Sequence, residues 1–274
     1  MFDIFSMPFF IRVIVVLFAT GLSFPVLGTF ILHLELVPVR FAVMHAALLG
    51  TAIAMIFNLN EMAFAMLASI IAGLGIARIS WKGKVSAGGS LGLIMTVCMG
   101  LAFIIFYKGN VHANEAFSIF WGNILTLNIS DTRISVIVSA LILLFLFISY
   151  KEIHIVLYDR NLAQITGVPS GFVYAGIMLA VCLGIAVAMR VTGALLIDAV
   201  TILPAFAARR VGKTFKTLIF WGAVFGVIMN LGGFALSLVL DLPVSSGIVL
   251  IGVVVILIVY CIEFLSGKLK NKSL

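Results

Sequence analysis

The sequence is short of charged residues. Asp, Glu, Lys and Arg make up only 10% of the 274 residues, whereas about 25% is usual in soluble domains. Hydrophobic residues reach 64%, and the mean hydropathy is +1.31. A soluble domain of this length has too little interior to bury so many apolar side chains, which excludes a soluble globular fold. Because the apolar runs are continuous rather than alternating, they favour membrane-spanning helices over the strands of a barrel.

Motifs of several enzyme classes are also missing. The chain has no GxxxxGK[ST] phosphate loop, so it cannot bind and hydrolyse ATP in that way, and it has no HExxH or CxxC motif. Its three cysteines lie inside apolar runs without a pairing pattern, and we interpret them as small hydrophobic residues. The sequence therefore predicts no enzyme and no bound cofactor.

The apolar runs predict nine candidate membrane spans. Their ranges are 9–31, 38–57, 62–77, 86–106, 134–149, 171–189, 193–208, 217–240 and 246–265. Several approach the lower limit of about 17 residues for crossing a membrane. The run at 193–208 is the least certain, because it is short and bounded by Arg190 and Arg209. We therefore predict an all-α, polytopic transmembrane bundle of eight or nine spans in the cell membrane, with residues 1–274 as one domain and no cleaved signal peptide.

The basic residues predict an orientation. If the C-terminus is cytoplasmic and nine spans alternate, 13 of the 17 basic residues fall on the cytoplasmic side, as the positive-inside rule requires. These are Arg40, Arg78, Lys82, Lys84, Lys151, Arg160, Arg209, Arg210, Lys213, Lys216, Lys268, Lys270 and Lys272. The N-terminus is then outside. The net charge of +7 is explained by this topology and by attraction to acidic lipid, so it requires no nucleic acid as a partner.

A short polar helix is predicted at about 159–167, between two membrane-length runs. Asp159 is a good N-cap, because its carboxylate can accept hydrogen bonds from the amides of the first turn. Gly167 suits the left-handed position that follows a helix. Leu162 and Ile165 fall on one face of the helix. The predicted orientation places this isolated helix in the cytoplasm, where we expect another protein to bind it.

Two ionisable residues lie well inside apolar runs. Such residues are rare in membranes and usually face the bundle interior or a pathway. His45 either lines a pathway and binds a ligand or is a hydrogen-bonded packing residue. Asp198 either lines a pathway or is a carboxylate hydrogen-bonded near Thr201 at a helix packing site.

Four segments carry a family resemblance in the same order and spacing. The second run contains His-Ala-x-x-x-Gly, at His45, Ala46 and Gly50, and FWGNILTLNISD follows at 120–131. YDRNLAQITGVP carries Asp159, Ala163 and Gly167, and VTGALLIDAVTILPAFAARR carries Gly193, Leu195, Leu196, Pro204 and Ala205. Over nearly its whole length, the chain resembles the membrane permease subunit of zinc/manganese ABC importers, the ABC-3 family.

The chain also departs from that family's pattern. The family usually has an aspartate one turn before the histidine, where this chain has Phe41, and an acidic pair near the fourth span, where this chain has residues 87–89 (Ala-Gly-Gly). Asp198 stands where the family generally has a small or apolar residue. We therefore predict a changed substrate pathway that includes Phe41 and Met44, with His45 and Asp198 as its metal ligands.

The resemblance implies a permease subunit without catalytic activity of its own, importing zinc or manganese. It also implies a separate cytoplasmic ATPase that grips the 159–167 helix through Asp159, Leu162, Ala163, Ile165 and Gly167, and a substrate-binding protein outside. One imidazole per subunit holds a divalent ion poorly, so we expect a homodimer that doubles the ligands. The alternatives are a secondary transporter with a proton or ion at Asp198 or His45, an ABC permease for a non-metal solute, and a membrane scaffold.

Overall fold

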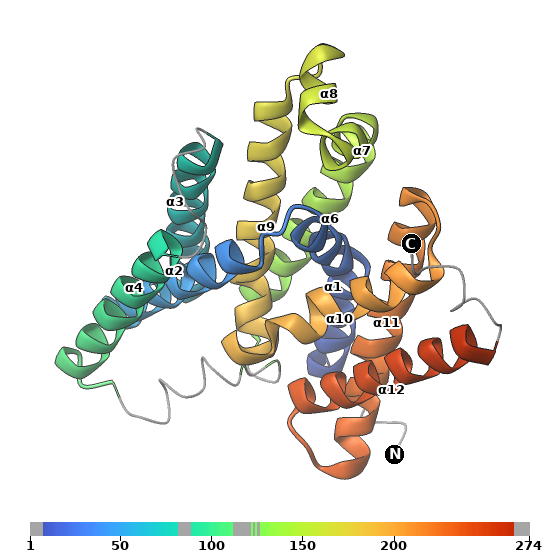
Figure 1. Cartoon of the computed structure of the whole chain (residues 1–274). Helices are drawn as coiled ribbons and strands as arrows, with labels where there is room; N and C mark the ends of the chain where they lie inside the picture. Colours follow the sequence, from blue (N-terminus) through green and yellow to red (C-terminus); the bar gives the residue numbers. More distant parts are fainter. Residues whose placement is uncertain (1–7, 82–88, 112–121, 123, 125–126, 266–274) are drawn as a thin grey trace.

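A computed structural model describes residues 8–81, 89–111, 122, 124 and 127–265. In this part of the chain every regular element is helical (Figure 1). The elements are α1 (Pro8–His33), α2 (Val37–Ile56), α3 (Glu61–Trp81), α4 (Gly89–Lys108), α6 (Ile129–Ile148), α7 (Tyr150–Tyr158), α8 (Arg160–Ile165), α9 (Ser170–Thr192), η3 (Ala194–Leu196), α10 (Ile197–Val211), α11 (Phe215–Leu240) and α12 (Val244–Leu265). Eight of the described helices are long and apolar enough to cross a membrane: α1, α2, α3, α4, α6, α9, α11 and α12. The all-α, polytopic prediction is confirmed.

The run at 193–208 differs from the other predicted spans. Gly193, with φ of 85°, ends α9, and the single turn η3 then precedes α10. α10 has 15 residues, which at about 1.5 Å per residue is too short for a membrane core of about 30 Å. Among the described residues, eight of the nine predicted spans are therefore membrane-length helices, and the run at 193–208 forms a shorter one, within the predicted eight or nine spans.

Ion pairs and a pocket define the two ends of the bundle. At one end, Arg190 of α9 lies beside Glu61 of α3 and Asp131 of α6. At the other end, the ends of α1, α7 and α10 surround a pocket of about 290 Å³ with His33, His154 and Arg209 in its lining. α10 begins after the Arg190 end and finishes at the α7–α8 end, so it returns the chain from one end to the other. α10 therefore reverses the direction of the chain as a ninth span would, and the predicted alternation of the chain between the two ends of the bundle is kept.

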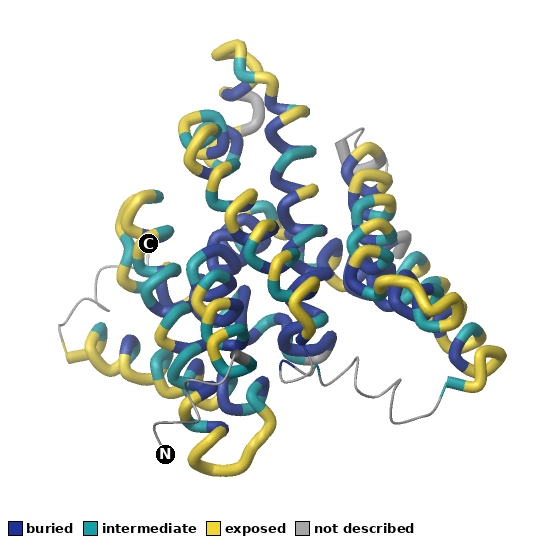
Figure 2. Tube along the Cα trace, turned by 180° about the vertical axis from the view of Figure 1, so that it is seen from behind, coloured by how far each residue is buried: buried dark blue, intermediate teal, exposed yellow. Residues whose placement is uncertain are grey.

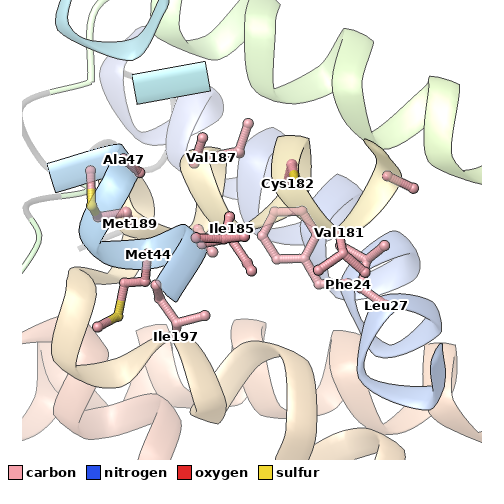
Figure 3. Packing of buried hydrophobic residues seen from close by; sticks show 14 of the residues in the cluster. Phe24, Leu27, Met44, Ala47, Val181, Cys182, Ile185, Val187, Met189 and Ile197 are labelled. Atoms are coloured by element: carbon pink, nitrogen blue, oxygen red, sulfur yellow. The ribbon is translucent and has the colours of Figure 1, made fainter. Parts of the chain in front are cut away.

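α9 lies between two groups of helices. It packs against α3 and α2 on one side and against α6 and α1 on the other. α4 continues the first group by packing on α2. In the second group α10 and α11 pack against α1, and α12 packs against α10 and α11 (Figure 1). Side chains from α1, α2, α9 and α10 meet in the core, as Figure 3 shows for Phe24, Met44, Ile185 and Ile197. α4 and α12 expose most of their surface (Figure 2), as expected of helices that face lipid or a partner.

Small residues allow α1, α10 and α11 to pack closely. A Cβ atom on Gly28 of α1 would overlap the carbonyl oxygen of Thr201 in α10. The amide of Asn230 in α11 donates to the carbonyl oxygen of Leu17 in α1 at 3.0 Å. Close backbone approach and buried interhelical hydrogen bonds are the usual means of helix association in lipid.

The segment before the polar helix was predicted incompletely. The fifth predicted span begins at residue 134, but α6 begins at Ile129, where Asn128 and Asp131 form a capping box. α6 ends at Ile148, and a separate nine-residue helix, α7, follows. α7 buries Ile153 and Val156, a pattern too short to distinguish from the end of the preceding apolar run.

Candidate functional site

The polar helix of the sequence is α8, a six-residue helix at the end of the bundle (Figure 1). Asp159 accepts a hydrogen bond from the backbone amide of Leu162 at 3.2 Å, so the predicted N-cap is confirmed. Gly167 has φ of 78°, which confirms the predicted left-handed position after the helix. Both features are local, which explains why the sequence predicts them correctly.

The two sides of α8 differ in burial. Ala163 is fully buried and holds α8 against α7 and α9. Leu162 is 43% exposed and Ile165 is 82% exposed, and Tyr158 at the end of α7 is exposed as well. These three side chains form an uncovered apolar surface at the α7–α8 end, which we call the α8 surface. Apolar surface of this kind at the tip of a bundle is typical of a protein interaction site.

Asp198 is paired with a residue that the sequence did not associate with it. Arg40 of α2 lies with Nη1 2.5 Å from Asp198 Oδ1, and its Nη2 donates to Oδ2 at 3.1 Å. The Arg40 side chain is only 2% exposed, whereas that of Asp198 is 45% exposed. The topology prediction counted Arg40 with the cytoplasmic basic residues, at the start of the span 38–57. Its side chain instead lies within the bundle, because the guanidinium needs a carboxylate partner there.

Phe41 lies beside this ion pair on α2, and His45 lies one turn further along the same helix. The guanidinium carbon of Arg40 is 4.1 Å from the centre of the Phe41 ring, a favourable cation–π distance. Nδ1 of His45 lies 2.8 Å from the carbonyl oxygen of Phe41. Because a carbonyl oxygen can only accept, Nδ1 carries the proton, and in the neutral ring Nε2 remains able to accept a hydrogen bond or bind a metal. His45 is buried and Phe41 is 39% exposed.

Met44, the fourth predicted pathway residue, lies in the hydrophobic core. Figure 3 shows it near Ile197, the residue that precedes Asp198. The structure thus brings α2 and the start of α10 together at Met44 and Ile197 and at Arg40 and Asp198. We call the group Arg40, Phe41, His45 and Asp198 the α2–α10 site.

The α2–α10 site lies well within the bundle. Val43, one turn from Arg40, packs beside Gly73, as does Cys182. Gly73 and Cys182 occupy the middle of α3 and α9, both membrane-length helices. Within α2, α9 and α10, Asp198 is the only acidic residue. A lone carboxylate at this depth would be costly, and the guanidinium of Arg40 compensates it.

One chain does not supply a full set of metal ligands at this site. Among the described residues, no group of three or more His, Cys, Asp or Glu side chains is close enough to hold a metal ion. His45 and Asp198 together offer one nitrogen and one carboxylate, fewer ligands than a divalent ion normally takes from protein. Positions 87 and 88, where this chain lacks the family's acidic pair, lie outside the described residues. Five lysines used in the topology prediction, at 82, 84, 268, 270 and 272, also lie outside them.

Arg40 is the residue of the α2–α10 site that the sequence analysis missed. Its signal was present, because an arginine inside an apolar run requires a nearby carboxylate or a route to the membrane surface. Asp198 was the other charged residue deep in an apolar run, so the two could have been paired on charge alone. Their separation of 158 residues hid the relationship.

Comparisons with known proteins agree with the architecture. The chain is 25% identical to the manganese transport system membrane protein MntC of Listeria innocua, over 92% of this chain and 90% of that protein. It is 27% identical to the manganese import system permease protein ScaB of Streptococcus gordonii, over 84% and 83%. A solved structure of PsaBC from Streptococcus pneumoniae in complex with Fab is similar with a TM-score of 0.83 and 26% identity, covering 94% of both chains. The model of the ABC 3 transport family matches residues 6–263, and the chain is therefore a membrane transport permease of that family.

Proposed function

We propose that this chain, acting over its whole length as one permease domain, imports a divalent metal ion across the cell membrane, with manganese the first candidate. Two of its relatives are named as manganese transport or import proteins. The chain works with a separate cytoplasmic ATPase, a substrate-binding protein on the outer face and a second copy of itself. His45 and Asp198 contribute the metal ligands of the pathway.

One observation carries this proposal: the Asp198 carboxylate is half exposed in the first turn of α10, within a bundle of membrane-length helices. Asp198 is 45% exposed in the single chain. Lipid tails cannot solvate a carboxylate, so the face that carries Asp198 must meet water or another protein chain. Phe41 is exposed beside it. A water-filled pathway between two copies satisfies both residues.

A second copy also completes the ligand set. Two chains that meet at this face supply two His45 imidazoles and two Asp198 carboxylates around one axis. Four ligands of this kind are enough to hold a manganese or zinc ion. A symmetric dimer is the commonest arrangement of soluble homo-oligomers and requires only that one face be self-complementary.

The α8 surface is the docking element for the ATPase in this proposal. Closure of two ATPase subunits on ATP would move α8 and α7 as a rigid unit, because Ala163 anchors α8 to the helices beneath it. The pathway between the two copies then opens to one side or the other. A secondary transporter would leave the exposed Leu162 and Ile165 without a role.

The test is uptake of radioactive manganese by vesicles that contain this chain, its ATPase and its binding protein. We expect uptake to depend on ATP and to be lost in Asp198→Asn and in His45→Ala, with unchanged co-purification of the ATPase. Phe41→Asp is expected to restore some uptake to the Asp198→Asn variant, because it returns a carboxylate one turn before His45. Uptake of manganese and zinc that is indifferent to both Asp198→Asn and His45→Ala would refute the assignment of this pathway.

A further inference from the structure

The ion pair of Arg40 and Asp198 raises a question about the proposed pathway, on which this inference rests. The proposed metal ligand Asp198 already has a cation beside it, at 2.5 and 3.1 Å. α2, α9 and α10 provide no other carboxylate. The charges of Arg40 and Asp198 cancel, so the α2–α10 site attracts a divalent cation weakly while Arg40 stays in place.

We propose that Arg40 is a tethered cation, which occupies the Asp198 carboxylate when no metal is bound and which an incoming metal ion must displace. Arg40 thereby determines how tightly the pathway holds its substrate. A transport site needs binding that is favourable enough for entry and weak enough for release. A resident guanidinium weakens binding without removing the carboxylate.

The burial of the two partners supports displacement. Arg40 approaches from the buried side, with 2% exposure, whereas Asp198 is 45% exposed on the open side. A metal ion can therefore reach the carboxylate without passing through the guanidinium. The buried Oδ1 of Asp198 faces Nη1 of Arg40, so the exposed part of the carboxylate is the part that an incoming metal ion meets first.

The Arg40 side chain has one polar partner within the described part of the chain, the Asp198 carboxylate. Among the described residues, Nε of Arg40 has no hydrogen-bond partner, and both terminal nitrogens of the side chain face Asp198. Its other contact is the Phe41 ring at 4.1 Å. The Phe41 ring still attracts the guanidinium by a cation–π interaction when the carboxylate binds a metal ion. Phe41 therefore stabilises Arg40 after its displacement from Asp198.

The experiment measures manganese binding by the purified complex of this chain and its ATPase, without nucleotide, using titration calorimetry. Arg40→Gln is expected to lower the Kd for Mn²⁺ about tenfold or more, because the competing charge is gone. The gain is expected to disappear in Arg40→Gln/Asp198→Asn. A folded Arg40→Gln complex that binds Mn²⁺ no more tightly than the unaltered one would overturn the proposal.

Arg210→Gln is the matched control. Arg210 also lies on α10 and belongs to another ion pair, 3.8 Å from Glu263, with a hydrogen bond to Tyr260 at 2.6 Å. Its replacement removes the same charge from a position near the end of the helix. We expect the Kd for Mn²⁺ to stay within about twofold of the unaltered complex, since the charge is remote and screened.

A second measurement uses the unaltered protein, so it tests the displacement of Arg40 even if Arg40→Gln does not fold. Phenylglyoxal modifies accessible arginines, and mass spectrometry reports the extent at each position. Saturating Mn²⁺ is expected to increase modification of Arg40 severalfold, with Arg190 and Arg210 unchanged, whereas an equal rate at Arg40 with and without metal would overturn the displacement.

The outcomes also separate this inference from the proposed function. Manganese uptake by the unaltered transporter together with unchanged affinity in Arg40→Gln would overturn the tethered cation alone. If neither protein binds or transports manganese or zinc, both the inference and the proposed function are wrong.

Discussion

Arg190 at the end of α9 lies 2.9 Å from the carboxylate of Glu61 at the start of α3. The same guanidinium lies 3.4 Å from Asp131 in the first turn of α6. Three helices that are far apart in sequence are thus joined at one end of the bundle. Besides pairing with Arg190, Asp131 completes the capping box with Asn128 at the start of α6.

The first prediction concerns this junction. Glu61→Gln is expected to lower the free energy of unfolding by only about 0.5 kcal/mol, because both Glu61 and Arg190 are about one third exposed. Asp131→Ala removes a buried cap and an ion pair together and is expected to cost about 2 kcal/mol. Thermal unfolding of the purified protein measures both. Equal effects of the two substitutions would contradict the roles assigned to them.

The second prediction concerns the α8 surface. Leu162→Asp and Ile165→Asp are each expected to abolish co-purification with the ATPase while the permease stays folded, because these exposed side chains are not needed in the core. Gln164→Ala, on an exposed neighbour, is the control and is expected to bind normally. Gly167→Val is expected to weaken binding as well, since φ of 78° is strained for a β-branched residue. Normal ATP-driven uptake in all three altered permeases would refute the docking role.

The third prediction concerns helix packing. Gly28→Val places a side chain against the backbone of Thr201 and is expected to destabilise the protein by about 3 kcal/mol or more. Gly92→Val in α4 is the control, because a Cβ at Gly92 meets no atom within 4 Å. Thermal unfolding is expected to separate the two variants clearly. A stable Gly28→Val protein would mean that α1 and α10 are farther apart than the structure places them.

The fourth prediction concerns orientation. In a variant without native cysteines, Asn110→Cys and Val244→Cys are expected to react with an impermeant thiol reagent from outside, and Lys213→Cys only after the membrane is opened. The reason is that Asn110 and Val244 adjoin the ends of α4 and α12, and Lys213 lies beside the α7–α8 end. If Lys213→Cys reacts in intact cells, the predicted topology is inverted and α8 lies outside the cytoplasm.

The sequence alone determined the features of this protein that depend on short stretches of chain. Continuous apolar runs predicted the membrane and the helices, because a helix satisfies its own backbone within each run. Asp159 and Gly167 predicted the start and the end of α8, because capping depends on residues within a few positions of each other. Even here α7 was missed, since its buried pair Ile153 and Val156 is too brief to indicate a separate helix.

Only the tertiary structure decided which helices meet and which charges neutralise one another. The sequence identified Asp198 as an unusual residue and suggested Thr201 as its neighbour, whereas Thr201 donates to the carbonyl oxygen of Ile197. It counted Arg40 only as a cytoplasmic charge at the start of the span 38–57. Their ion pair depends on α2 and the start of α10 coming together across 158 residues. The close approach of Gly122 to the backbone at Gly193, where α9 ends, is likewise a contact between distant parts of the chain. Long-range contacts of this kind arise from the packing of whole helices, because no local pattern of residues encodes the partner.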